Sequence, residues 1–99
     1  MKYYPEVVQV ITGEGKNIIV YFSDGRITKY NMTPLIAKGG IFNKLEDRDF
    51  FTHRLTVMNN TAAWDLSGKH DPTDCIDIDP VTLYEAEQVS DPLEVDLVS

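Results

Sequence analysis

Cysteine, basic residues and long hydrophobic runs are all scarce in this 99-residue sequence. The lone Cys75 cannot form an internal disulfide or supply a cysteine-rich zinc site, which agrees with a reducing compartment. The longest apolar runs, such as Ile18 to Phe22, are far shorter than the roughly 20 residues that a membrane-spanning helix needs. We therefore expect a soluble, cytoplasmic protein with neither a membrane span nor a signal peptide.

The shortage of basic residues gives the chain a strong negative charge. Nine lysines and arginines stand against 16 acidic residues, for a formal net charge of −7. Such a field repels phosphate backbones, so direct binding of nucleic acid is disfavoured. It also steers the chain toward basic protein partners.

The strongest structural signal is a β-hairpin over Asn17 to Asn31, with Asp24-Gly25 at its turn. A two-residue turn at this dipeptide would place Phe22 opposite Ile27. Two apolar faces would result, which hold Ile18, Val20, Phe22 and Ile27 on one side and Ile19, Tyr21, Thr28 and Tyr30 on the other. A sheet with one wet face alternates more cleanly, so a helix, a terminal segment or another subunit is expected to cover the second face.

Further elements complete an α+β fold class. A strand over Glu6 to Thr12 extends the hairpin into an antiparallel three-stranded meander. A second hairpin is expected, with strands over Leu55 to Met58 and Thr61 to Leu66 and with Asn59-Asn60 at its turn. Two or three short helices are predicted, one beginning at Thr33-Pro34 with the threonine as cap and ending at Gly39-Gly40, one over Asp47 to His53, and one beginning at Asp79-Pro80.

The chain divides into one domain over residues 1–88 and a tail over residues 89–99. Leu93, Val95 and Leu97 alternate with acidic residues in the tail, a pattern that is typical of a strand. An alternating apolar segment of this kind is a suitable donor to the open sheet edge of a partner.

The acidic segment that follows the second hairpin is the part of the sequence where a metal-binding or catalytic site is expected, if there is one. His70, Asp74, Asp77 and Asp79 lie within ten residues. Asp77 and Asp79 would project to one side of an extended segment, where carboxylate oxygens suit a divalent cation. The alternative interpretation is that these aspartates serve turns and helix caps. Cys75 stands among acidic residues, which would raise its thiol pKa and so argues against a nucleophile.

The order of several motifs resembles a prokaryotic family known as domain of unknown function 2442. The motifs are Tyr21-Phe22-Ser23-Asp24-Gly25-Arg26, Pro34-Leu35, a short helix centred on Phe50, Trp64, and the run from Asp77 to Tyr84. The resemblance implies a small α+β domain without known catalytic residues, and in that family the gene is often found beside another small gene, as in toxin–antitoxin pairs. The Asp65 to Cys75 segment is longer than the family pattern, and the Ser90 to Ser99 tail is additional.

These observations favour a non-enzymatic protein-interaction module without a cofactor. The partner would be another copy of the chain or a basic neighbouring gene product. The residues predicted to bind it are Ile19, Tyr21, Tyr30, Leu93, Val95 and Leu97. The alternative hypothesis is a metal-binding or metal-dependent hydrolytic domain that uses Asp77, Asp79, Asp74 and His70.

Overall fold

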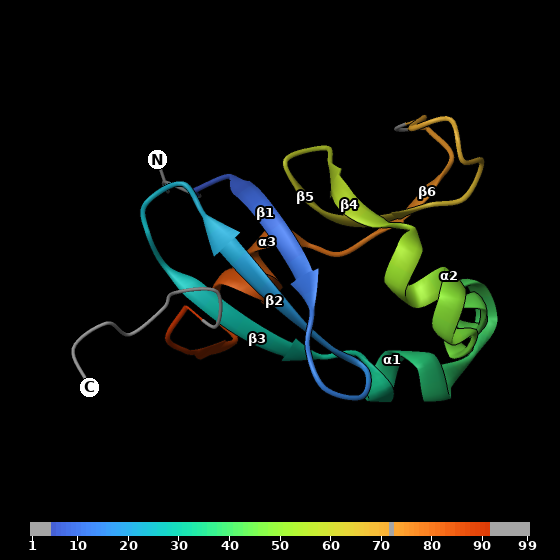
Figure 1. The fold of residues 1–99 in the computed structure, drawn as a ribbon, viewed down its shortest axis with the longest axis horizontal. Coiled ribbons are helices and arrows are strands. Elements are labelled where there is room, and N and C mark those ends of the chain that lie inside the picture. The colour runs from blue at the N-terminus through green and yellow to red at the C-terminus, as the bar shows by residue number, and fades with distance from the viewer. Residues whose placement is uncertain (1–4, 72, 92–99) are drawn as a thin grey trace.

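The computed structural model describes residues 5–71 and 73–91, and it contains two antiparallel sheets and several short helices (Figure 1). The first sheet has the strand order β1-β2-β3-β7, with β1 Val7–Thr12, β2 Asn17–Phe22, β3 Ile27–Asn31 and β7 Glu87–Gln88. The second has the order β4-β5-β6, with β4 Leu55–Met58, β5 Thr61–Asp65 and β6 Cys75–Asp77. The predicted α+β class is confirmed, and β7 and β6 each add a strand to the expected meander and hairpin.

The short helices begin largely where their caps predict. Asp47 accepts hydrogen bonds from the backbone N–H groups of Asp49 and Phe50 at the start of α2 (Arg48–His53). Asp79 accepts one from Val81 at the start of α3 (Pro80–Tyr84). For α1 (Thr33–Lys38) the predicted threonine cap is wrong, because the Asn31 side chain accepts the Thr33 N–H instead.

The glycine pair after α1 ends that helix but does not end helical structure. Gly39 has a φ of 78° and Gly40 a φ of 66°, a conformation that side chains with a Cβ rarely adopt. The chain then forms a 3₁₀ helix, η1 (Gly40–Glu46), which buries Leu45. Lys16 holds η1 against the β1–β2 turn, since its ammonium group donates to the Leu45 and Glu46 carbonyls at 2.7 and 3.1 Å.

The register predicted for the β2–β3 hairpin is wrong by one residue. The amide of Phe22 bonds the carbonyl of Arg26, so three residues close the loop and Tyr21 pairs with Ile27. The type I′ two-residue turn that Asp-Gly favours needs positive φ at both positions, whereas only Gly25 has it here, at 94°. Asp24 instead accepts the Arg26 N–H through its side chain at 2.9 Å.

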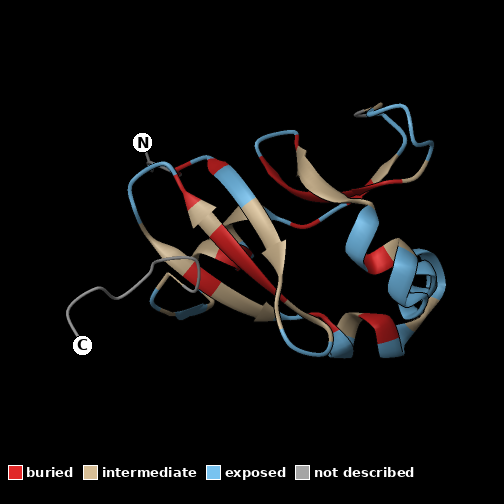
Figure 2. Cartoon of the chain, in the orientation of Figure 1, coloured by how far each residue is buried: buried red, intermediate tan, exposed pale blue. Residues whose placement is uncertain are grey.

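The second hairpin has the predicted turn. Asn59 and Asn60 have φ values of 55° and 62°, as a two-residue loop requires, and Met58 pairs with Thr61. Every residue of β5 is buried, because this strand lies between β4 and β6 in the middle of its sheet (Figure 2).

A single hydrophobic core joins both sheets and the helices. It contains Ile18, Val20 and Phe22 from β2, Trp64 from β5 and Leu83 from α3. The indole N–H of Trp64 donates to the Phe51 carbonyl at 2.9 Å, so the largest core side chain has no unsatisfied polar atom.

The residues after β7 begin beside the first sheet. The Val89 amide donates to the Ile27 carbonyl, and Asp91 reaches Tyr21 on β2. The predicted strand with Leu93, Val95 and Leu97 lies outside the described residues, and the division at residue 88 stays a prediction. No helix among the described residues has the length and apolar character needed to cross a membrane.

Candidate functional site

The outer face of the first sheet carries two cross-strand rows of mainly apolar side chains. One row is Ile11, Ile19 and Lys29, and the other is Gln9, Tyr21 and Ile27. These six residues define the outer face. Figure 1 looks onto this side of the sheet, with α3 behind it.

The inner face of the same sheet belongs to the core. Val20 lies between Val10 and Thr28, and Ile18 lies between Thr12 and Tyr30. Tyr30 and Thr28 therefore lie on the core side and not beside Ile19 and Tyr21, and Ile27 lies on the outer face and not beside Val20, which corrects the predicted faces. The one-residue change in register is the physical cause, because side chains alternate strictly between the faces of a strand.

No described helix packs its buried side chains on the outer face. The buried side chains of α1, η1, α2 and α3 all belong to the core on the inner side. On the outer face Ile19 is 7% exposed, while Ile11, Tyr21 and Ile27 are half-buried.

Carboxylates stand at the margin of the outer face. The Tyr21 hydroxyl donates to Asp91 at 2.7 Å, and burial together with this carboxylate raises the pKa of Tyr21 to about 12. Lys29, the sole cation in the two rows, lies 3.8 Å from the carboxylate of Glu87. The apolar rows are therefore bordered by carboxylates, of which that of Glu87 pairs with Lys29.

The acidic residues predicted to bind a metal serve mainly local structure. Asp77 and Asp79 do project to the exposed side of their segment, since Ile76 and Ile78 between and beside them are buried. Asp79 caps α3, and Asp77 accepts a long 3.5 Å hydrogen bond from Asn59. Among residues 5–71 and 73–91, no three histidine, cysteine or acidic side chains converge as metal ligands do. The predicted metal site stays a prediction.

Cys75 has the environment that its neighbours predict. Burial, followed by the charge of Asp77 and of the other nearby aspartates, raises the pKa of its thiol. A raised thiol pKa leaves little thiolate, so Cys75 is poorly suited to nucleophilic chemistry.

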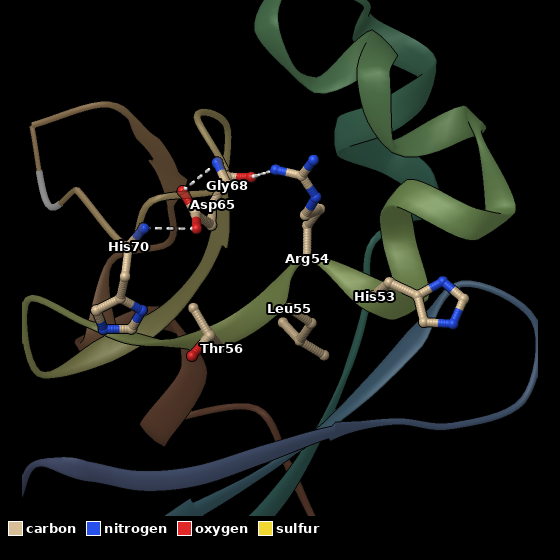
Figure 3. Close-up of a pocket in the computed structure, with 7 residues that line it drawn as sticks. All are labelled: His53, Arg54, Leu55, Thr56, Asp65, Gly68 and His70. Atoms are coloured by element: carbon tan, nitrogen blue, oxygen red, sulfur yellow. Dashed lines mark hydrogen bonds between the residues drawn. The ribbon is translucent and has the colours of Figure 1, made fainter.

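A polar hollow lies on the outer side of the second sheet, between β4 and the loop that follows β5 (Figure 3). Its volume is about 450 Å³, and it is lined by His53, Arg54, Leu55, Thr56, Asp65, Gly68 and His70. His70 belongs to the predicted acidic segment, whereas the other six residues were not predicted. The sequence gives little sign of them, because the lining comes from two segments that only β4–β5 pairing brings together.

The loop that borders the hollow is folded around one carboxylate. Asp65 accepts hydrogen bonds from the Gly68 and His70 amides, at 3.1 and 2.8 Å, and from the Ser67 hydroxyl. Burial opposes ionisation of Asp65, but these donors and the charge of Arg54 outweigh it, so the pKa of Asp65 lies below its usual value.

Two of the sequence motifs meet in space at the turn of the first hairpin. The Tyr84 hydroxyl donates to Asp24 at 2.7 Å, and the Arg26 guanidinium donates to the Tyr84 carbonyl at 2.8 Å. Arg26 also lies over the Tyr84 ring, and Phe22 meets that ring edge-on. The Ser23 to Arg26 turn and the helix that ends at Tyr84 thus fix each other.

The residues of these two motifs thus stabilise the fold of a small α+β domain. The chain belongs to the family described as protein of unknown function (DUF2442), whose model matches residues 7–88. No curated protein and no solved structure matches the chain significantly.

Proposed function

We propose that the protein is a non-enzymatic interaction module that binds a basic protein partner through the outer face of the first sheet. The observation that carries this proposal is the pair of apolar rows, on which no described helix packs its buried side chains. A sheet face that meets water is normally polar, and the partial exposure of Ile11, Tyr21 and Ile27 leaves apolar surface on this face that a partner could bury.

Charge favours a basic partner over a second copy of the chain. The net charge is −7, and the carboxylates of Asp91 and Glu87 border the rows. Lysine or arginine side chains around an apolar patch would complement this margin, whereas two copies would repel each other. The same charge argues against direct binding of nucleic acid. We place the complex in the cytoplasm, where the thiol of Cys75 stays reduced.

The test uses the product of the neighbouring gene as the partner and measures its affinity for the full chain by calorimetry. Ile27→Glu puts a charge in the outer face at a half-buried position and should weaken binding about tenfold or more. Ile41→Glu is the matched control, because Ile41 is 54% exposed on η1, away from the outer face. Its effect should stay below about twofold.

Two further measurements complete the design. Raising salt from about 50 mM to about 500 mM should weaken the complex, because exposed charges are then screened. Truncation after Gln88 removes the Asp91–Tyr21 contact and the alternating segment, and it should also weaken binding. Absence of binding, equal effects of both glutamate variants, or dimers of this chain alone by light scattering would each contradict the proposal.

A further inference from the structure

The polar hollow collects hydrogen-bond donors in an otherwise acidic molecule. The sequence has two histidines, and both line this hollow although 17 positions separate them. Arg54 lies between them in the view of Figure 3, where the His53 ring points away from Arg54 and His70. A chain with a net charge of −7 thus places the Arg54 and His70 side chains at one surface depression.

Arg54 is held in position from several sides. One guanidinium nitrogen donates to the Asp65 carbonyl at 3.0 Å, and the group lies 5.7 Å from the centre of the Phe50 ring. Gly68 comes so close that a Cβ at its position would stand 3.1 Å from the same nitrogen. A guanidinium fixed in this way loses little conformational freedom when it binds a ligand.

The acceptor in the hollow is already engaged. Both oxygens of the Asp65 carboxylate accept hydrogen bonds from the loop, from Gly68 and Ser67 on one side and from His70 on the other. Within the described part of the chain, the imidazole of His70 and the hydroxyl of Thr56 have no hydrogen-bond partner. The imidazole of His53 contacts the Asp49 carbonyl on its own helix through Nδ1 at 3.1 Å and points away from Arg54 and His70 (Figure 3), so it is not aimed at a ligand in the hollow.

The backbone conformation at His70 determines where its side chain lies. His70 has a φ of 57°, a left-handed conformation that histidine, like asparagine and aspartate, adopts more readily than other residues with a Cβ. The bond from its amide to Asp65 holds this conformation, and the ring lies on the side of the hollow where Thr56 stands (Figure 3).

We propose that this hollow binds a small organic anion with two or more acidic groups, through Arg54 and His70. Carboxylates and phosphates both accept hydrogen bonds from guanidinium and imidazole groups. The donors stand on different sides of a hollow of about 450 Å³, so one acidic group cannot use both of them. A divalent cation is disfavoured by the positive charge of Arg54. This site is separate from the outer face and does not depend on the proposed partner.

The experiment titrates the full chain with citrate, pyrophosphate and acetate, followed by calorimetry and amide chemical shifts. Citrate or pyrophosphate should bind about tenfold tighter than acetate, with the largest shifts at Thr56, Gly68 and His70. Citrate alone would identify a carboxylate ligand, and pyrophosphate alone a phosphate ligand. Equal, weak binding of all three anions would overturn the proposal.

Variants then assign the binding to the hollow. His70→Asn keeps a polar group and suits the left-handed backbone at position 70. It should lower the affinity about tenfold, as should Arg54→Gln.

Arg48→Gln is the matched control, because it removes a cation that bonds the Gly15 carbonyl outside the hollow. Should Arg54→Gln fail to fold, Arg54→Lys keeps the charge without the planar fork and should still weaken binding. An equal loss in Arg48→Gln would show general charge attraction and refute the site.

Discussion

The two hairpins of this protein reach well-defined turns by different means. In the β4–β5 hairpin, Asn59 and Asn60 both take positive φ, so the turn is determined by its own two residues. In the β2–β3 hairpin, Asp24 bonds Tyr84, sixty positions away, and only Gly25 takes positive φ. The first kind of turn can be predicted from local residues, whereas the second depends on what packs against it.

The largest expected effect tests whether both hairpins stabilise one cooperative unit. Trp64 is fully buried in the common core, and its indole N–H satisfies the Phe51 carbonyl. Trp64→Ala should lower the free energy of unfolding by about 3–5 kcal/mol, measured by urea denaturation. Because the core is shared, amide exchange should accelerate in β2 as well as in β5. Acceleration confined to β4 and β5 would show that the hairpins unfold separately.

The difference between the two turns explains how far the sequence could predict the fold. Caps such as Asp47 and Asp79 and the Asn59-Asn60 turn use donors, acceptors and φ values of adjacent residues, and these predictions are confirmed. The Asp24-Gly25 dipeptide fits two loop lengths, and contacts with α3 accompany the longer one. The wrong loop length moved Tyr30 to the wrong face of the sheet.

The outer face could be predicted in part from neighbouring residues, whereas the hollow could not. Ile19 and Tyr21 share a face because they lie two positions apart on one strand, which the sequence shows directly. The hollow could not be predicted, since Arg54 and His70 come together only through the pairing of β4 with β5 and the loop folded around Asp65. Short β7 was also missed, because two residues carry no periodic pattern.

A second prediction compares the two turns at their backbone. Gly25 has a φ of 94°, and a Cβ added there would meet no atom within 4 Å, so Gly25→Ala meets conformational strain alone. It should cost about 1–2 kcal/mol of unfolding free energy. Asn60→Gly, at a φ of 62°, should change stability by less than about 0.5 kcal/mol, since glycine adopts this conformation freely. Equal losses in urea denaturation would mean that the two turns do not differ in this way.

The smallest effect concerns acid and separates the charges near the two hairpins. The Arg26 amide and then the Tyr84 hydroxyl hold the pKa of Asp24 below its ordinary value of 3.8. A carboxyl whose pKa is lower in the folded state binds fewer protons there than in the unfolded chain. Its contribution is therefore complete above about pH 4 and is lost as the pH falls through the folded-state pKa.

Asp24→Asn should accordingly flatten the dependence of stability on pH below about pH 4, measured by urea denaturation at each pH. Part of the slope should persist, because hydrogen bonds also lower the pKa values of Asp65 and Asp71 in the loop after the second hairpin. Tyr84→Phe removes one of the two hydrogen bonds to Asp24 and should give an intermediate slope. If Asp24→Asn keeps the full slope while Asp65→Asn abolishes it, acid sensitivity resides in the second region alone, and the turn of the first hairpin is held by packing and not by its charge.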